Sequence, residues 1–472
     1  MLRASAVAER AGVASVSVIS TGFLQQAALI SRNLGLPDMA IAEYPGVPMN
    51  DSLEEFRRKV EEHIYPAIVD GLMKSSASRK SEGIVNEPED REIVYCGSFD
   101  EVQEHFHANC WSDGLPIVPP TIERVERFLR FTTRDPQEVI GSLPLAHRKL
   151  TVWNVAVNGV MAGCRPEYMP ILLAAAEVLV DPKFKAEDCG STPGWEPMLT
   201  LSGPLGRELG FNSGQGALRI GRQANSSVGR FVRMIVRNVA GFTISPEGLD
   251  KATIGMNFQI ALAENEDACV QMGWTTYGQD RGFSIDDSVV TIQSVLIVSP
   301  PTYSAGDKPE EHAMLLADVL GDRTAGYWAG VAMAYSNYHP IIVLGPAIAK
   351  IFAVNGWTKD MLRDYLYKNC RMKAKTAEGY AWAGGVTGFD MNRYAREGLL
   401  PPAYGESTDP DRLVPVFQRP EWIQIVVAGD NGRNQSKGYI NNHLQGVPTS
   451  RKVTLPPDWK VMLAASRPAS AN

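Results

Sequence analysis

Residues 6–60, AVAERAGVASVSVISTGFLQQAALISRNLGLPDMAIAEYPGVPMNDSLEEFRRKV, decide the fold of the first part of the chain. Residues 4–11 have the composition of a helix that ends at Gly12, and residues 13–19 alternate valine with serine as strands do. Residues 23–34 are amphipathic and predict a second helix. Helices that alternate with short apolar strands indicate an α/β fold with a parallel sheet.

The same stretch continues with a second strand and a long helix. Residues 36–42 form the predicted strand, and residues 52–72 form the predicted helix with Asp51 or Ser52 as its N-cap. Because the first element is a helix with no strand ahead of it, the pattern is that of a doubly wound domain cut in the middle. We therefore expect a truncated doubly wound domain in which the strand at residues 13–19 is incompletely covered.

The length of the chain requires more than this one domain. Its 472 residues exceed the usual domain of about 100 to 200 residues, so we expect two or three hydrophobic cores. Residues 1–74 form the predicted N-terminal domain, and residues 75–92 are rich in Ser, Glu and Lys, which is the composition of a linker. Residues 93–465 are predicted to form one larger α/β domain with the substrate site. No internal repeat is visible in the sequence.

Composition and charge exclude several classes of protein. The net charge is -7, with 21% charged residues and both signs interspersed, so we expect no nucleic-acid surface. No segment has the roughly 18 uncharged apolar residues that a membrane crossing needs, and the start does not resemble a secretory signal. We therefore predict a cytoplasmic protein with reduced thiols and no disulfide framework. Its six cysteines, none in a short paired spacing, are Cys96, Cys110, Cys164, Cys189, Cys269 and Cys370.

The segment HFHANCWSDGLPIVPPT, residues 105–121, concentrates polar and aromatic side chains ahead of a turn. A metal site made of His105, His107 and Cys110 would require extended backbone, because histidines two apart diverge on a helix. The alternative is a capping Asp113 on a buried loop with solvent-facing histidines.

A second segment places a cysteine beside a predicted helix start. Arg165, Pro166 and Glu167 have the composition of a first helical turn, so Cys164 would lie at the helix N-terminus. The partial positive charge there lowers a thiol pKa, which makes Cys164 the preferred thiolate, with Asn158 in the same crevice. The alternative is a small buried cysteine that only packs.

Two further segments offer polar groups for a substrate. Asn225, Ser226 and Arg230 follow a glycine-rich stretch at a predicted helix start, where a carboxylate or phosphate could bind. An ion-paired arginine face is the alternative. Glu264, Asn265 and Glu266 directly follow an apolar strand, where open α/β sheets gather functional groups. The two carboxylates could hold Mg²⁺ or serve as acid and base, although a surface turn has the same composition.

Residues 1–73 resemble the small domain of the UGSC-type (seleno)protein family, which is distantly similar to component B of glycine reductase. In that family a selenocysteine or cysteine lies in a turn just before the helix that corresponds here to residues 3–11. This sequence begins after the expected place of that turn, so the resemblance implies a redox turn supplied by a small protein subunit or by a missing N-terminal segment. Later segments, such as CWSDGLPIVPPT and AENEDA, resemble a large domain of unknown chemistry that is fused behind it.

The combined hypothesis is a thiol- or selenol-dependent oxidoreductase that acts on a small anionic metabolite and forms an oligomer. The alternatives are a metal-assisted lyase or hydrolase and a non-catalytic subunit of a hetero-oligomer. No motif indicates a cofactor, no metal ligands are assigned, and a divalent metal stays open. The predicted catalytic residues are Cys164, Cys110, Asp113 and Glu167. The predicted substrate-binding residues are Asn158, Asn225, Ser226, Arg230, Glu264 and Asn265.

Overall fold

The computed structural model describes residues 2–73, 91–143, 148–244, 248–335 and 338–466. Most of the predicted linker, at residues 75–90, lies outside the described residues. The chain divides into two compact units, which are described separately. Unit 1 comprises Met1–Trp111, Ser142–Lys149 and Arg237–Asp250, and unit 2 comprises Ser112–Gly141, Leu150–Val236 and Lys251–Asn472.

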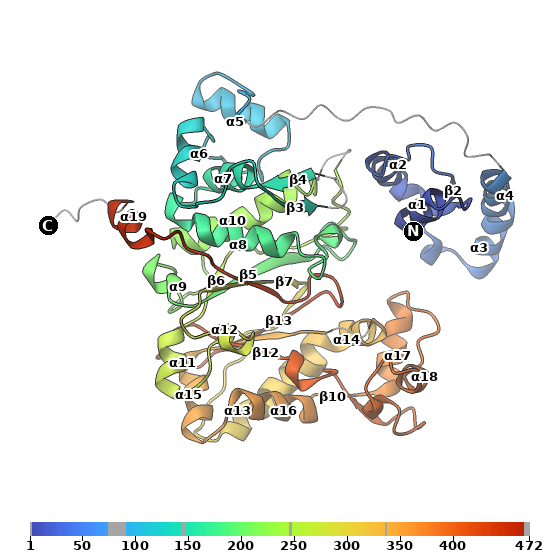
Figure 1. Ribbon diagram of the computed structural model, residues 1–472. Coiled ribbons are helices and arrows are strands. Elements are labelled where there is room, and N and C mark those ends of the chain that lie inside the picture. The colour runs from blue at the N-terminus through green and yellow to red at the C-terminus, as the bar shows by residue number, and fades with distance from the viewer. Residues whose placement is uncertain (1, 74–90, 144–147, 245–247, 336–337, 467–472) are drawn as a thin grey trace. The chain divides into compact units, whose positions relative to one another are not determined.

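The first seventy residues of unit 1 form the predicted α/β fold, coloured blue in Figure 1. Strands β1 and β2 pair in parallel, and the intervening helix α2 supplies the crossover. The Ser52 hydroxyl caps the third helix by accepting from the Glu55 N–H, as the sequence predicted. Their elements are α1 (Leu2–Arg10), β1 (Ser17–Ser20), α2 (Leu24–Asn33), β2 (Ile41–Tyr44), α3 (Leu53–Lys59), a π-helical stretch (Val60–Ile64) and α4 (Tyr65–Met73). Helix α5 (Phe99–Ala108) comes later in unit 1.

Both strands begin about four residues later than predicted. Gly12, at φ +77°, ends α1, and the Val13 N–H donates back to the Ala8 carbonyl, so the next residues close the helix instead of starting a strand. In the described residues β1 and β2 pair only with each other. One edge of each strand therefore has no described strand beside it.

Unit 2 is built around two four-stranded sheets. One has the strand order β14-β7-β5-β6 and the other β12-β9-β13-β8. The strands after β2 are β3 (Val139–Leu143), β4 (Arg148–Thr151), β5 (Glu196–Ser202), β6 (Leu262–Ala263), β7 (Val289–Val295), β8 (Ile297–Val298), β9 (Ile341–Leu344), β10 (Arg371–Lys373), β11 (Leu413–Pro415), β12 (Gln424–Val427), β13 (Ser436–Ile440) and β14 (Thr449–Lys452).

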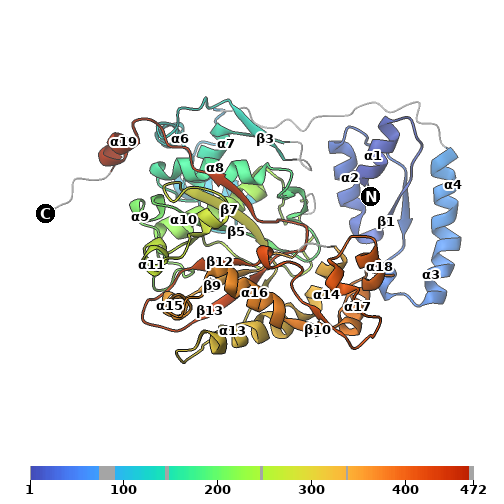
Figure 2. The same cartoon turned by 60° about the horizontal axis from the view of Figure 1, so that its bottom comes forward.

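The two sheets pack face to face between two layers of helices (Figures 1 and 2). Helix α8 covers the outer face of the β5–β7 sheet, and α13, α15 and α16 cover the β9–β12 sheet. The helices after α5 are α6 (Ile122–Leu129), α7 (Val152–Met161), α8 (Met169–Leu179), α9 (Leu205–Glu208), α10 (Gln223–Asn238), α11 (Glu266–Met272), α12 (Tyr277–Asp280), α13 (Pro309–Asp318), α14 (Gly326–Ala334), α15 (Pro346–Val354), α16 (Lys359–Asn369), α17 (Ala374–Ala383), α18 (Met391–Arg396) and α19 (Trp459–Ser466).

The layer between the sheets is a continuous hydrophobic core. It includes Met198 of β5, Leu262 of β6, Val295 of β7, Ile341 and Val343 of β9, Val426 of β12 and Tyr439 of β13. Burial of these side chains from both sheets supplies a large part of the driving force for folding. Within the described residues, no helix is long and apolar enough to cross a membrane.

The two sheets share one topology, so unit 2 contains an internal repeat that the sequence analysis missed. In each sheet a central strand pairs in parallel with the second strand and antiparallel with the third, as β5 does with β6 and β7, and β9 with β12 and β13. The sequence WEPMLTLSGP at residues 195–204 corresponds to YHPIIVLGP at residues 338–346. In sequence, β8 comes directly after β7 but pairs with β13, and β14 comes directly after β13 but pairs with β7. Each half of the repeat therefore contributes one strand to the sheet of the other half.

Candidate functional site

A pocket of about 640 Å³ in unit 2 is lined by α6, the turn after α7 and α19. We call it the arginine-lined pocket. Its charged side chains are four arginines and one glutamate, so its net charge is positive. The polar lining consists of Arg124, Arg127, Arg130, Cys164, Arg165, Glu167 and Ser466. The predicted residues Cys164 and Glu167 therefore share one pocket.

The arginines of this pocket differ in whether they already bond to other residues of the protein. Arg165 Nε lies 2.7 Å from Glu167 Oε1, and Arg124 Nη1 donates to the Pro119 carbonyl at 2.9 Å. Arg127 and Arg130 are exposed, and their guanidinium groups make no hydrogen bond or ion pair with another described residue. These two guanidinium groups are available to an anion.

Cys164 is a neutral thiol, which contradicts the predicted thiolate. Burial raises its pKa to about 12, and the opposing effects of the Ser227 hydroxyl and the Arg230 charge are smaller. The residue follows the turn at Gly163, at φ +78°, and its thiol lies in the core below the pocket surface. Removing a thiolate from water at this position costs more free energy than the partial positive charge of a helix N-terminus contributes.

Asp113, predicted as a catalytic residue, binds Arg230, which was predicted to bind the substrate. Arg230 Nη2 and Nε lie 2.6 and 2.8 Å from the two carboxylate oxygens, and Nη2 also donates to the Pro116 carbonyl at 3.0 Å. Burial alone would raise the pKa of Asp113, but the Arg230 guanidinium holds it below the ordinary value. The bidentate pair leaves neither group open to a ligand, so the ion-paired alternative describes this site.

Several predicted substrate-binding amides also have internal partners. Asn225 is fully buried and bonds the Asn212 backbone and the Ala261 carbonyl. Asn265 caps α11 by accepting from the Ala268 N–H, and Asn158 donates to the Asn154 carbonyl in its own helix. These side chains therefore fix the backbone. The Ser226 hydroxyl is buried and has no hydrogen-bond partner among the described residues.

The histidines and the cysteine of the 105–121 segment lie in unit 1. His105 and His107 are on helix α5, so the extended backbone that their metal site required is absent and that interpretation is contradicted. Cys110 belongs to unit 1, whereas Cys164 and Arg230 belong to unit 2. The residues expected to form a single substrate site therefore do not all belong to one compact unit.

A second polar site stands where β5 and β6 end, at the carboxyl ends of two parallel strands. The Ser202 hydroxyl lies 2.7 Å from Glu264 Oε2 and 3.2 Å from Glu266 Oε1. The Gly203 N–H donates to Glu266, and the Tyr277 N–H donates to Glu264 at 2.7 Å. Sequence reasoning found Glu264 and Glu266 but missed Ser202, although the LSGP turn after an apolar strand was a usable signal.

Burial makes Glu264 and Glu266 weaker acids than ordinary glutamates. Burial raises the pKa of Glu264 above its ordinary value, although the Lys359 charge opposes the rise. Burial and then the Glu264 charge raise the pKa of Glu266 to about 7. A carboxyl group with this pKa exchanges a proton near neutral pH, as a general acid or base must.

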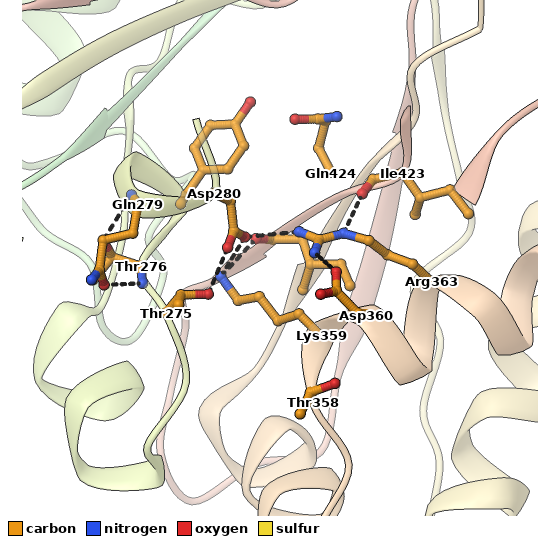
Figure 3. Close-up of polar contacts among 12 residues, drawn as sticks. Thr275, Thr276, Gln279, Asp280, Thr358, Lys359, Asp360, Arg363, Ile423 and Gln424 are labelled. Atoms are coloured by element: carbon orange, nitrogen blue, oxygen red, sulfur yellow. Dashed lines mark hydrogen bonds and ion pairs between the residues drawn. The ribbon is translucent and has the colours of Figure 1, made fainter. Parts of the chain in front are cut away.

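A buried ion network of Asp280, Lys359 and Arg363, shown in Figure 3, contacts the carboxyl pair through Glu264. Lys359 Nζ lies 3.1 Å from Asp280 Oδ2 and 3.8 Å from Glu264 Oε1, and its side chain is 3% exposed. Arg363 Nη2 lies 2.8 Å from the same Asp280 oxygen, and its Nε donates to the Ile423 carbonyl. The network ties the end of β6 to α12 and α16. Sequence reasoning missed it because its members lie up to about a hundred residues apart.

We expect Glu266→Gln to change how stability depends on pH. The pKa of Glu266 is about 7 in the folded protein and near 4.5 in the unfolded chain, so the folded protein holds an extra proton between these values. The wild type should therefore lose stability as pH rises from 5 to 8, and the variant should lose less. Thermal unfolding at pH 5 and pH 8 measures this difference. Equal changes in melting temperature for both proteins would contradict it.

The described residues contain no group of three or more His, Cys, Asp or Glu side chains placed to hold a metal ion. Comparison of the chain with curated proteins finds no significant match. Comparison with protein-family models finds a match at the N-terminus, over the segment that folds as α1 to α4. This match covers residues 1–74 and is to the UGSC family, so the N-terminal part of the chain is similar to a UGSC-type domain.

Proposed function

We propose that this protein is an enzyme that acts on a small anionic metabolite and binds it in the arginine-lined pocket. The observation that supports this most directly is the pair Arg127 and Arg130, whose guanidinium groups face the pocket without a described partner. Arg165 adds a third charge, which Glu167 balances. Planar guanidinium groups recognise carboxylates and phosphates through paired hydrogen bonds, and the pocket volume suits a molecule of metabolite size.

The reaction class that we propose is thiol- or selenol-dependent redox chemistry. The UGSC-type domain supports this class. The raised pKa of Cys164 favours a reactive group from elsewhere, because a neutral thiol is a poor nucleophile. We propose that a partner subunit supplies the reactive thiol or selenol to the bound anion. Cys164 would then only line the pocket as a neutral thiol.

Removal of the two free arginines tests the anion site. We expect Arg127→Ala together with Arg130→Ala to weaken binding of phosphate or succinate at least about tenfold, because each lost charge-assisted bond contributes more than about 1 kcal/mol. Isothermal titration with the full chain measures the affinity. Arg393→Ala is the control, because that arginine is exposed on α18 outside the pocket, where it donates to the Gly388 carbonyl and lies 3.9 Å from Glu397. An unchanged affinity in the double variant would contradict the proposal.

A second candidate function is acid–base catalysis by a lyase or hydrolase at Glu264 and Glu266. The pKa of about 7 for Glu266 favours it, together with the Ser202 hydroxyl that bridges both carboxyl groups. Activity abolished by Glu266→Gln but retained after loss of Arg127 and Arg130 would favour this candidate. If neither change affects activity and the chain only binds a partner protein, the non-catalytic subunit is supported instead.

A further inference from the structure

The layer between the two sheets of unit 2 contains four buried polar atoms that have no hydrogen-bond partner among the described residues. Thr200 and Gln293 are at most 1% exposed, as is Tyr277. Unpaired buried polar groups are rare in folded proteins and normally indicate a bound water or ligand. The four atoms are Thr200 Oγ1, Tyr277 OH, Gln293 Oε1 and His339 Nδ1.

Strand register places these side chains on one layer. Thr200 is the parallel neighbour of Leu262, and Gln293 is the antiparallel neighbour of Met198. Directly paired residues share a face of a sheet, and Leu262 and Met198 belong to the core between the sheets. Thr200 and Gln293 therefore point into that layer.

The other two side chains reach the same layer from the neighbouring elements. Tyr277 of α12 belongs to the same inter-sheet core. His339 stands two residues before Ile341, which faces the core, and its carbonyl accepts from Gln293 Nε2 at 3.4 Å. We call this group of four side chains the interlayer site.

An arginine without a carboxylate partner lies beside the interlayer site. Arg281 donates to the Ser450 hydroxyl at 3.1 Å and to the Pro448 carbonyl at 2.9 Å, and it makes no ion pair with a described residue. The Ser450 hydroxyl lies 2.8 Å from that of Thr291, which is the direct neighbour of Thr200. Burial raises the pKa of Tyr277 to about 12 and lowers that of His339, and the nearby Arg281 charge opposes the first change and adds to the second.

These buried polar atoms need hydrogen-bond partners, which either ordered water or a ligand would supply. Each buried polar atom that loses its water partners costs about as much free energy as a lost hydrogen bond, and four such costs would rival the net stability of a domain. Burial keeps His339 neutral, with its pKa lowered to about 3, so it adds no charge. Thr200, Tyr277 and one tautomer of His339 are donors, whereas Gln293 Oε1 is an acceptor.

We propose that the interlayer site binds a small hydroxycarboxylate. The carboxylate of the ligand lies against Arg281 and the hydroxyl groups of Thr200 and Tyr277, and the hydroxyl of the ligand donates to Gln293 Oε1. Arg281 and His339 are partly exposed, which gives the ligand a side from which to enter. This site shares no residue with the arginine-lined pocket, so it is independent of the function proposed above.

The test compares glycolate with acetate, which lacks the hydroxyl, on the full chain at constant ionic strength. We expect glycolate to raise the melting temperature saturably and to bind at least tenfold more tightly than acetate. Gln293→Met should reduce glycolate affinity to that of acetate, and Arg281→Gln should reduce both at least tenfold. Thr200→Val, nearly isosteric, provides a second variant in case the others fold poorly, and we expect a several-fold loss of glycolate affinity.

The outcomes separate this site from the arginine-lined pocket. Glycolate binding that persists in the Arg127 and Arg130 double variant and falls in the Arg281 variant supports the interlayer site. Binding that falls only in the double variant overturns it. If glycolate has no effect on the wild type, ordered water alone fills the layer and the proposal is wrong.

Discussion

Lys359→Met should lower the free energy of unfolding by about 3–5 kcal/mol, which is the usual cost of removing one member of a buried ion pair. Lys359 is 3% exposed and lies between Glu264 and Asp280. Methionine fills the same space but removes the cation that opposes the raised pKa of Glu264, so this group must take up a proton or stay as an uncompensated buried charge, whereas Asp280 keeps Arg363. Urea unfolding at pH 7.5 measures the loss. The deficit should shrink at low pH, because Glu264 is then protonated.

Two further variants separate the charge effect from a packing effect. Lys368→Met lies on the same helix, α16, but is exposed, so its stability should stay within about 0.5 kcal/mol of the wild type. Glu264→Gln added to Lys359→Met should restore part of the loss, because no buried charge is then left unpaired. If the double variant is no more stable than Lys359→Met alone, the packing explanation is correct and the ion network is not the cause.

The local elements of unit 1 were predictable because short-range signals determine them. The Ser52 cap and the helix end at Gly12 depend on residues within one or two turns. The strand positions were displaced because the same valine and serine pattern continues through the turn after α1. The start of each strand is decided by the pairing of β1 with β2, which is a long-range contact that the local sequence does not show.

The candidate site was predicted less well, because its chemistry depends on partners far away in the sequence. Asp113 and Arg230 were each recognised as functional types, but they are 117 residues apart and nothing local shows that they bind each other. Cys164 was placed at a helix start, where a low pKa is expected, but the burial that reverses the effect comes from the whole fold. Arg127 and Arg130 were passed over, because charges on a helix face usually indicate only a solvated surface.

The internal repeat explains why polar chemistry gathers in one half of unit 2. The Glu264 N–H donates to the Leu201 carbonyl just as the Ala428 N–H donates to the Leu344 carbonyl, so these positions are equivalent. Ser202 of the first half has no counterpart in the second half, where Leu344 is followed directly by Gly345. Glu264 of the first half corresponds to Ala428 of the second half. The second half instead contributes Lys359, which reaches across to Glu264. The acidic site is thus completed by both halves, although only one supplies its carboxyl groups.

That acidic site depends on a glycine, and Gly203→Ala should lower the free energy of unfolding by at least about 3 kcal/mol. A Cβ there would lie 2.3 Å from Ser288 Cα and 2.4 Å from the Asp287 carbonyl oxygen, which are backbone atoms that cannot turn aside. Gly210→Ala is the control, because Gly210 also has positive φ, +75°, but nothing lies within 4 Å, so about 1 kcal/mol is expected. Equal losses in urea unfolding would mean that backbone strain alone acts at Gly203. A larger loss at Gly203, with a changed pH dependence, would show that close packing of β5 against the start of β7 holds the Gly203 N–H against Glu266.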